Sequence, residues 1–179
     1  MNRVYLMLGS NMGDRAALLE SAVEMLIEEL MPNYLEVEDL SDAVNTSDMV
    51  ETEPWGFESS DKFLNQAFMT LTDKSAEQVL AICQSVEERL GRDRSVPATD
   101  ATGKRVYLSR NIDIDIIFFD CDGVPQVIDT PQLKVPHPLM HQRMFVLEPL
   151  SQIAKEYMHP VIKKSVGVLK KELKKSLKN

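Results

Sequence analysis

The sequence predicts an α+β fold, specifically a ferredoxin-like βαββαβ domain with a mostly antiparallel sheet and C-terminal additions. Strand-length apolar runs and two amphipathic helices follow one another in the order β-α-β-β-α-β, which is the signature of that fold. The chain has 179 residues, which is enough for one domain with a small appendage. Its hydrophobic content of 44% is too high for a disordered chain.

The first half of the chain predicts a strand, a helix and two further strands. Residues 4–8 (VYLML) are an apolar run that ends in Gly-Ser-Asn, as a buried strand does when it enters a turn. Asp14 can cap a helix whose apolar residues recur at helical spacing as far as Leu30. Residues 35–50 are weakly patterned and are expected to form a strand with a polar face, and residues 63–71 form the next strand.

The second helix and the last strand carry the clearest local signals. Ser75, with Gln78 three residues later, forms a capping box that opens a helix. Gly91 can end that helix, because glycine readily adopts the left-handed conformation that follows a helix C-terminus. Residues 111–119 (NIDIDIIFF) then form the strongest strand in the chain.

The C-terminal region adds a connecting segment and two helices. Residues 131–149 are rich in proline, and a short helix is expected at residues 151–157. Residues 163–179 contain seven Lys and one Glu, with apolar residues at helical spacing. We therefore expect a main domain over residues 1–160 and a Lys-rich, solvated C-terminal helix over residues 161–179. Contact of this helix with a membrane surface or a polyanion is the less favoured alternative.

The charge distribution restricts the partners. The net charge is −8, and the first 162 residues hold 13 cationic and 27 anionic side chains, which argues against nucleic-acid binding. No apolar run approaches the roughly 20 residues of a membrane span, and no signal peptide is visible. We expect a cytoplasmic monomer without nucleic-acid or membrane partners. Cys83 and Cys121 are expected to be buried thiols rather than a disulfide or a metal pair.

Positive charge is concentrated in one predicted loop. Six cationic residues lie within a 22-residue segment that contains only two acidic residues. They are Arg89, Arg92, Arg94, Lys104, Arg105 and Arg110. Such an island on an acidic protein suits a small, highly charged anion. The alternative is that these side chains are simply solvated.

Two aspartates in the strongest strand form a candidate metal site. Side chains alternate along a strand, so Asp113 and Asp115 share one face with their Cα atoms about 7 Å apart. The residues expected on the other face, under the helices, are Ile112, Ile114, Ile116 and Phe118. Two neighbouring carboxylates repel each other, and a Mg²⁺ ion between them would remove that cost and accept phosphate oxygens. Solvation or pairing with arginine is the alternative, but the adjacent cationic loop favours ATP chemistry.

An ordered set of motifs resembles a known enzyme family, the 6-hydroxymethyl-7,8-dihydropterin pyrophosphokinases of folate biosynthesis. The resemblance covers about residues 3–155. The motifs, in chain order, are Gly9-Ser-Asn-x-Gly-Asp-Arg15, Phe63-Leu-Asn65, the helix end from Gln84 to Gly91, Arg110-x-x-Asp113-Ile-Asp115-Ile-Ile117 and Val135-Pro-His137.

The resemblance implies that a diphosphate passes from ATP to the hydroxymethyl group of a reduced pterin, with release of AMP. ATP would be the co-substrate and two Mg²⁺ ions the cofactors, both held by Asp113 and Asp115. These two residues, with Arg92 and Arg110, would be catalytic. The residues implied to bind ATP are Gln84, Arg92, Arg94, Tyr107, Arg110, Ile116, His137 and Arg143. The residues implied to bind the pterin are Thr52, Glu53, Pro54, Trp55, Phe63, Asn65 and Phe145, with the two phenyl rings on opposite faces of the pterin.

Two other functions remain open. A nucleotidyltransferase also uses a Gly-Ser turn and an Asp-x-Asp strand, but it releases pyrophosphate. A non-enzymatic ferredoxin-like binding module would leave the aspartates solvated. The product formed from ATP distinguishes the three functions. A pyrophosphokinase releases AMP, a nucleotidyltransferase releases pyrophosphate, and a binding module shows no turnover.

Overall fold

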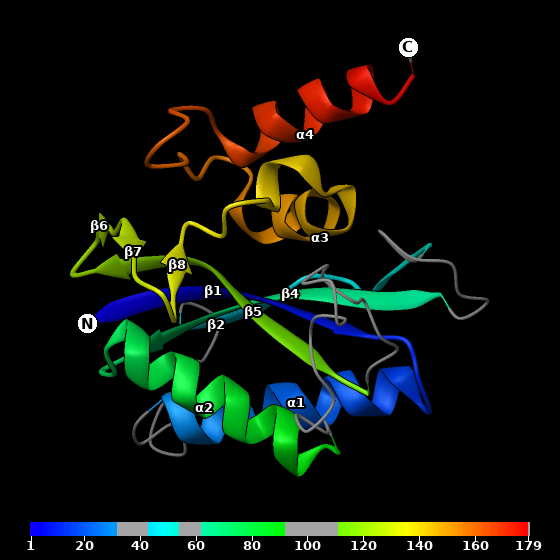
Figure 1. The fold of residues 1–179 in the computed structure, drawn as a ribbon, viewed down its shortest axis with the longest axis vertical. Helices are drawn as coiled ribbons and strands as arrows, with labels where there is room; N and C mark the ends of the chain where they lie inside the picture. The colour runs from blue at the N-terminus through cyan, green and yellow to red at the C-terminus, as the bar shows by residue number, and fades with distance from the viewer. Residues whose placement is uncertain (32–42, 54–61, 92–110, 179) are drawn as a thin grey trace.

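The computed structural model describes residues 1–31, 43–53, 62–91 and 111–178. They form an antiparallel sheet with helices on both faces (Figure 1). The strands are β1 (Asn2–Ser10), β2 (Val44–Thr46), β3 (Val50–Thr52), β4 (Phe63–Thr72), β5 (Asp113–Cys121), β6 (Val124–Pro125), β7 (Ile128–Asp129) and β8 (Lys134–Val135). The helices are α1 (Arg15–Leu30), α2 (Ala76–Arg89), a 3₁₀ turn (Met140–Gln142), α3 (Met144–Ala154) and α4 (Val166–Ser176).

The strand order confirms the predicted ferredoxin-like fold. The large sheet runs β2-β4-β1-β5-β6, with β3 also paired to β4, and each of these pairs is antiparallel. The strand predicted over residues 35–50 is, in its described part, two short strands that pair with successive stretches of β4. The strands β7 and β8 form a separate antiparallel pair.

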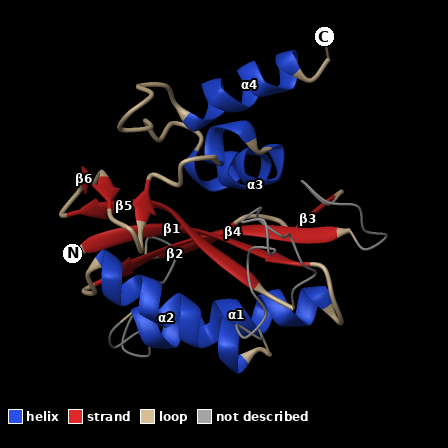
Figure 2. Cartoon of the chain, viewed as in Figure 1, coloured by secondary structure: helices blue, strands red, loops and turns tan. Residues whose placement is uncertain are grey.

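Local capping explains where the two central helices begin. The Asp14 side chain accepts a hydrogen bond from the Ala17 backbone N–H at 3.1 Å and starts α1. Ser75 and Gln78 form the predicted capping box at the start of α2. Gly91 follows the end of α2 with a φ of +90°, as predicted. Both helices pack on one face of the sheet (Figure 2).

One predicted facing in β5 is wrong. The pairing of β1 with β5 skips Ile117, which is one extra residue in β5. A bulge of this kind reverses the alternation beyond it, so Phe118 lies in the core beneath α3 and Phe119 lies under α1 and α2. The residues whose predicted facing is confirmed are Ile112, Ile114 and Ile116.

The C-terminal region covers the second face of the sheet. Here α3 packs on the sheet through Val146, Leu147 and Leu150, which are all buried. The predicted helix at residues 151–157 therefore begins earlier, at Met144, and contains Pro149. A proline inside a helix costs about 3 kcal/mol, and the burial of this apolar face offsets that cost.

The Lys-rich helix α4 is present but is solvated on one side only. It packs against α3 (Figure 1), with Val166 and Leu169 buried in the core on that side of the sheet. The Lys170 ammonium donates to Glu148 at 2.9 Å and to Ser151 at 3.0 Å, both on α3. Each of the described helices is too short or too polar to cross a membrane.

The two cysteines differ in burial. Cys83 is buried under the sheet as predicted, whereas Cys121 is exposed and the prediction for it is wrong. Cys121 ends β5 at the turn into β6, and at a strand end no second layer covers the side chain. Both thiols are free.

Candidate functional site

The register of three central strands places polar residues in one row. Gly9 of β1 pairs with Asn65 of β4 on one side and with Asp113 of β5 on the other. In the next row, Met7 pairs with Asp115 of β5. Directly paired residues in antiparallel strands point to the same face, so this face, which α3 also covers, carries Asn65 and both aspartates.

Gly9 allows a close approach in the middle of the row. A Cβ atom at position 9 would lie 3.2 Å from Asn65 Oδ1 and 3.8 Å from a ring carbon of Phe63. The first distance is shorter than an ordinary van der Waals contact. The absence of a side chain at position 9 therefore lets the Asn65 amide and the Phe63 ring lie close to the β1 backbone.

The orientation of the Asn65 amide is set by β3. Its Nδ2 donates to the Thr52 hydroxyl oxygen at 2.8 Å and to the Val50 carbonyl at 3.3 Å. These bonds use the two amide hydrogens, so Oδ1 is the atom that points towards Gly9. Asn65 is only 3% exposed. The site thus offers a fixed hydrogen-bond acceptor at its inner end.

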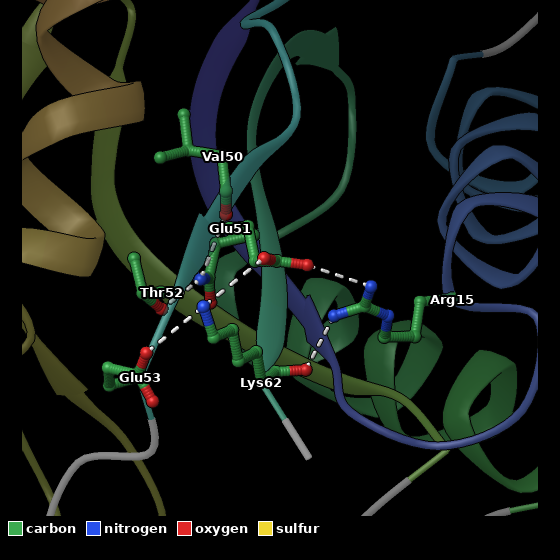
Figure 3. A network of polar contacts seen from close by, with 7 residues as sticks. Arg15, Val50, Glu51, Thr52, Glu53 and Lys62 are labelled. Atoms are coloured by element: carbon green, nitrogen blue, oxygen red, sulfur yellow. Dashed lines mark hydrogen bonds and ion pairs between the residues drawn. The ribbon is translucent and has the colours of Figure 1, made fainter. Parts of the chain in front are cut away.

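An ion-pair network holds β3 beside the start of β4 and α1 (Figure 3). Arg15 of α1 donates to the Lys62 carbonyl at 2.7 Å and to the Glu51 carboxylate at 2.9 Å. Lys62 in turn lies 3.2 Å from Glu53 and 3.8 Å from Glu51, and these contacts raise the pKa of its ammonium group. Exposed pairs contribute little stability, but these contacts join α1, β3 and the residue before β4 next to Thr52.

Two aromatic residues lie on the α3 side of the sheet. Phe63 begins β4 and is half-buried, two residues before Asn65 on the same face. Phe145 lies in the first turn of α3 and is also half-buried. The guanidinium carbon of Arg143, a residue that is 5% exposed, lies 5.6 Å from the centroid of the Phe145 ring. This geometry is typical of a cation–π contact.

Asp113 and Asp115 are half-buried, and the residues that alternate with them are in the core. In the part of the chain that the structure describes, no group of three or more His, Cys, Asp or Glu side chains could hold a metal ion. Two carboxylates alone fit a hard cation that takes its other oxygen ligands from phosphate and water, which is how Mg²⁺ binds in many phosphoryl-transfer sites. The donor set thus fits Mg²⁺ with a phosphorylated substrate.

His137 lies beside β5, where its backbone N–H donates to the Ile117 carbonyl at 3.1 Å. It lines a pocket of about 310 Å³ between the β7–β8 pair and the segment before α4. His141 and His159 line the same pocket, and burial, with the nearby His141, lowers the pKa of His159 to about 4.

The remaining sequence-predicted residues are separated from this row or lie outside the described residues. Gln84 is exposed on α2, and Ile116 is buried in the core under α1 and α2, so neither lies on the face of the aspartates. The residues outside the described ranges are Pro54, Trp55, Arg92, Arg94, Tyr107 and Arg110.

Glu87 of α2 is a residue that sequence reasoning did not single out. Its side chain accepts a hydrogen bond from the Ile114 backbone N–H, between the two aspartates, and it is 2% exposed. The sequence does contain a signal for it. Glu87 follows the buried Val79 and Cys83 at intervals of four residues, which places a carboxylate on the apolar stripe of the helix.

Comparisons with a family model and with individual proteins agree on one family. The family model described as 7,8-dihydro-6-hydroxymethylpterin-pyrophosphokinase (HPPK) matches residues 5–155. A Porphyromonas gingivalis 2-amino-4-hydroxy-6-hydroxymethyldihydropteridine pyrophosphokinase is 40% identical over 157 residues, which are 88% of this chain and 93% of the relative. Relatives with the same name from Bacillus subtilis and Aquifex aeolicus are 35% and 34% identical, over 87% and 96% of this chain and 80% and 92% of their own lengths.

Solved structures agree on the fold. A crystal structure of HPPK-DHPS in complex with substrates matches 99% of this chain with a TM-score of 0.69 and 14% identity. A Plasmodium falciparum HPPK-DHPS with pterin and p-hydrobenzoate also matches 99% of it, with a TM-score of 0.67 and 16% identity. This chain covers only 44% and 45% of those longer chains.

Proposed function

The chain belongs to the 7,8-dihydro-6-hydroxymethylpterin-pyrophosphokinase family, and we propose that it transfers the diphosphate of ATP to 6-hydroxymethyl-7,8-dihydropterin in folate synthesis, with AMP as the second product. The observation that carries the proposal is the row formed by Asn65, Gly9 and Asp113. It combines a fixed amide acceptor, a glycine and a carboxylate on one face of three adjacent strands.

The pterin would lie beside Asn65 and Phe63. Asn65 Oδ1 would accept a hydrogen bond from an N–H group on the edge of the ring, because Thr52 and Val50 already accept from Nδ2. Phe63 and Phe145 would stack on the two faces of the pterin ring, which suits offset aromatic packing. The other residues proposed to border the pterin are Thr52, Glu53, Pro54 and Trp55.

The triphosphate of ATP would lie beyond the pterin, towards Asp113 and Asp115. These carboxylates would hold Mg²⁺, with two ions as the proposed number, and bound Mg²⁺ neutralises charge on the phosphate oxygens. Catalytic roles are proposed for Arg92 and Arg110 beside the two aspartates. The residues proposed to bind ATP are Gln84, Arg92, Arg94, Tyr107, Arg110, Ile116, His137 and Arg143.

The reaction is an in-line displacement at the β-phosphorus. The pterin hydroxymethyl oxygen forms a bond to that phosphorus while the bond to the bridging α,β-oxygen breaks. The hydroxyl proton is released, and AMP leaves with the bridging oxygen. The protein contributes mainly by holding the two substrates in line and by placing cationic groups at the phosphates.

The product assay separates this function from its alternatives. The protein is incubated with ATP, Mg²⁺ and 6-hydroxymethyl-7,8-dihydropterin, and the nucleotide and pterin products are identified. We expect AMP and the pterin diphosphate in equal amounts, and no AMP when the pterin is omitted. Formation of pyrophosphate would support a nucleotidyltransferase, and no turnover would support a binding module.

The remaining predictions concern the setting of this activity. We propose that residues 1–160 carry it and that residues 161–179 form an appendage. A cytoplasmic monomer without nucleic-acid or membrane partners stays a prediction. Size-exclusion chromatography with light scattering, run at a series of protein concentrations with and without substrates, tests whether the protein is a monomer.

A further inference from the structure

Among the described strands, β5 pairs with β1 alone where it carries the two aspartates. Over residues 113–119, β5 pairs with β1, whereas its pairing with β6 is confined to Asp120 and Cys121. Strand edges leave backbone N–H groups that need other partners. The Ile114 N–H, midway between Asp113 and Asp115, finds one in the Glu87 carboxylate, at 2.7 Å from Oε1.

Burial of the Glu87 carboxylate at this position costs free energy. Glu87 is 2% exposed, and a buried carboxylate is tolerated only with strong hydrogen bonds or charge partners. At 2.7 Å, the bond from the Ile114 N–H to Glu87 Oε1 lies at the short end of the range for N–H···O bonds. The pKa of the Cys83 thiol is raised, chiefly by burial and then by the charges of the Glu87 and Asp115 carboxylates.

A second contact joins the same two elements. The Asn111 side chain, just before β5, donates to the Gly91 carbonyl at 3.3 Å, just after α2. A Cβ atom at Gly91 would lie 2.8 Å from Asn111 Nδ2, and the φ of +90° at Gly91 also favours glycine. The end of α2 is thus attached to the start of β5 at two points, and the point at Glu87 lies between the aspartates.

We infer that Glu87 is a positioning residue for the nucleotide half of the site: its carboxylate oxygen holds the β5 backbone at Ile114 and so sets the relative placement of Asp113 and Asp115. The inference rests on the proposed function, in which these aspartates hold Mg²⁺ with ATP. It assigns Glu87 a role through the hydrogen bond that it accepts, not through its charge. Groups that orient metal-binding side chains in this way affect metal affinity by about 10- to 100-fold.

Two substitutions separate the hydrogen bond from the charge. Glu87→Gln keeps the length of the side chain and an acceptor oxygen but removes the charge, whereas Glu87→Asp keeps the charge but shortens the reach by one methylene. We expect Glu87→Gln to bind Mn²⁺, used as the probe with a non-hydrolysable ATP analogue, within about threefold of the wild type. We expect Glu87→Asp to bind it about 10-fold or more weakly. Pterin binding without nucleotide should be the same in both variants and in the wild type.

Amide hydrogen exchange at Ile114 supplies a readout that needs neither metal nor substrate. It should be slow in the wild type and in Glu87→Gln, and faster in Glu87→Asp. Val79→Ala is the matched control, because Val79 is a fully buried α2 residue whose truncation lowers stability without removing the bond to Ile114. It should lower the unfolding temperature but leave Mn²⁺ affinity unchanged, and it should speed exchange at Ile114 no more than at the other core amides.

The outcomes distinguish this inference from the proposed function. If Asp115→Asn binds Mn²⁺ with the ATP analogue as tightly as the wild type, the metal assignment itself fails. If Asp115→Asn weakens binding but both Glu87 variants match the wild type, the positioning role alone is overturned. The reverse pattern, with Glu87→Gln weak and Glu87→Asp normal, would also overturn it, because charge and not the hydrogen bond would then be responsible.

Discussion

Asn65 and Asp113 lie on either side of the same residue, Gly9, on three adjacent strands of one sheet. This relationship places an amide acceptor and a carboxylate on one face with only a glycine between them. In the proposed reaction the two substrates would meet along this row, with the pterin beside Asn65 and the phosphates beside Asp113. The five predictions that follow test the row and the elements that support it.

The first prediction concerns the close approach of Asn65 to Gly9. Gly9→Ala places a methyl group 3.2 Å from Asn65 Oδ1, so the amide must shift or the pterin must move outwards. We expect pterin affinity to fall by about 1–3 kcal/mol, or about 5- to 150-fold, with nucleotide affinity unchanged. Isothermal titration with the pterin alone and the ATP analogue alone measures both. Gly167→Ala on α4 is the control, and equal pterin affinity in both variants would mean that the contact between Gly9 and Asn65 does not affect pterin binding.

The second prediction concerns the Thr52 hydroxyl, which accepts from Asn65 Nδ2. Thr52→Val removes that acceptor while keeping the shape of the side chain, so the Asn65 amide is no longer held in one orientation. A hydrogen bond contributes about 0.5–1.5 kcal/mol, so pterin affinity should fall about 2- to 10-fold. Thr52→Ser, which keeps the hydroxyl, should bind as the wild type does. Similar losses in both variants would mean that the hydroxyl is not what orients Asn65.

The third prediction concerns the two aspartates. Asp113→Ala and Asp115→Ala should each lower turnover by at least about 100-fold at saturating Mg²⁺, because a phosphate-neutralising ion loses a ligand. The unfolding temperature should stay equal or rise, since the substitution relieves repulsion between two carboxylates. Asp73→Ala changes an exposed aspartate beyond the end of β4 and should leave both quantities unchanged. Near-normal turnover in either site variant would contradict the assignment.

The fourth prediction concerns the docking of α4. Leu169 of α4 is 5% exposed in the hydrophobic cluster that α4 forms with α3, whereas its neighbour Val168 is 42% exposed. Leu169→Ala should lower the free energy of unfolding by about 2–5 kcal/mol, and Val168→Ala should change it by less than about 0.5 kcal/mol. Urea denaturation followed by circular dichroism measures both. Equal effects would mean that α4 does not pack on α3 in solution.

The fifth prediction concerns pH and His159, whose pKa is lowered to about 4 by burial and by His141. Its Nδ1 accepts from the Val161 and Ile162 N–H groups at 3.2 and 3.1 Å, so the folded state favours the neutral ring. The unfolded chain then binds the proton first, and stability should fall as pH decreases from about 6.5 to 4, by at most about 1.4 kcal/mol per unit.

Urea titrations of the wild type and of His159→Gln at pH 7.5 and pH 5 test this dependence. The variant should lose less stability between the two pH values than the wild type does. An identical loss in both proteins would assign the pH dependence to other groups.

The helix starts and the β5 alternation were accessible from the sequence because they depend on neighbouring residues. Asp14, Ser75 and Gln78 bond to backbone groups within three positions, so a short stretch of sequence contains both partners. The shared face of Asp113 and Asp115 follows from the two-residue period of a strand. The sequence motifs were also sufficient to identify the family, because they are ordered along one chain.

Tertiary structure decided the features that depend on partners distant in the chain. The extra residue at Ile117 arises from the register of β5 on β1, and no local pattern reports a register. Because α3 packs on the sheet, the helix continues past Pro149, where local helix propensity alone would end it. Glu87 and Ile114 are 27 residues apart, and Gly9 lies 56 residues before Asn65. Such pairs exist only once the sheet has formed. Packing of the core, and not the chain between the two residues, brings their backbone and side-chain groups together.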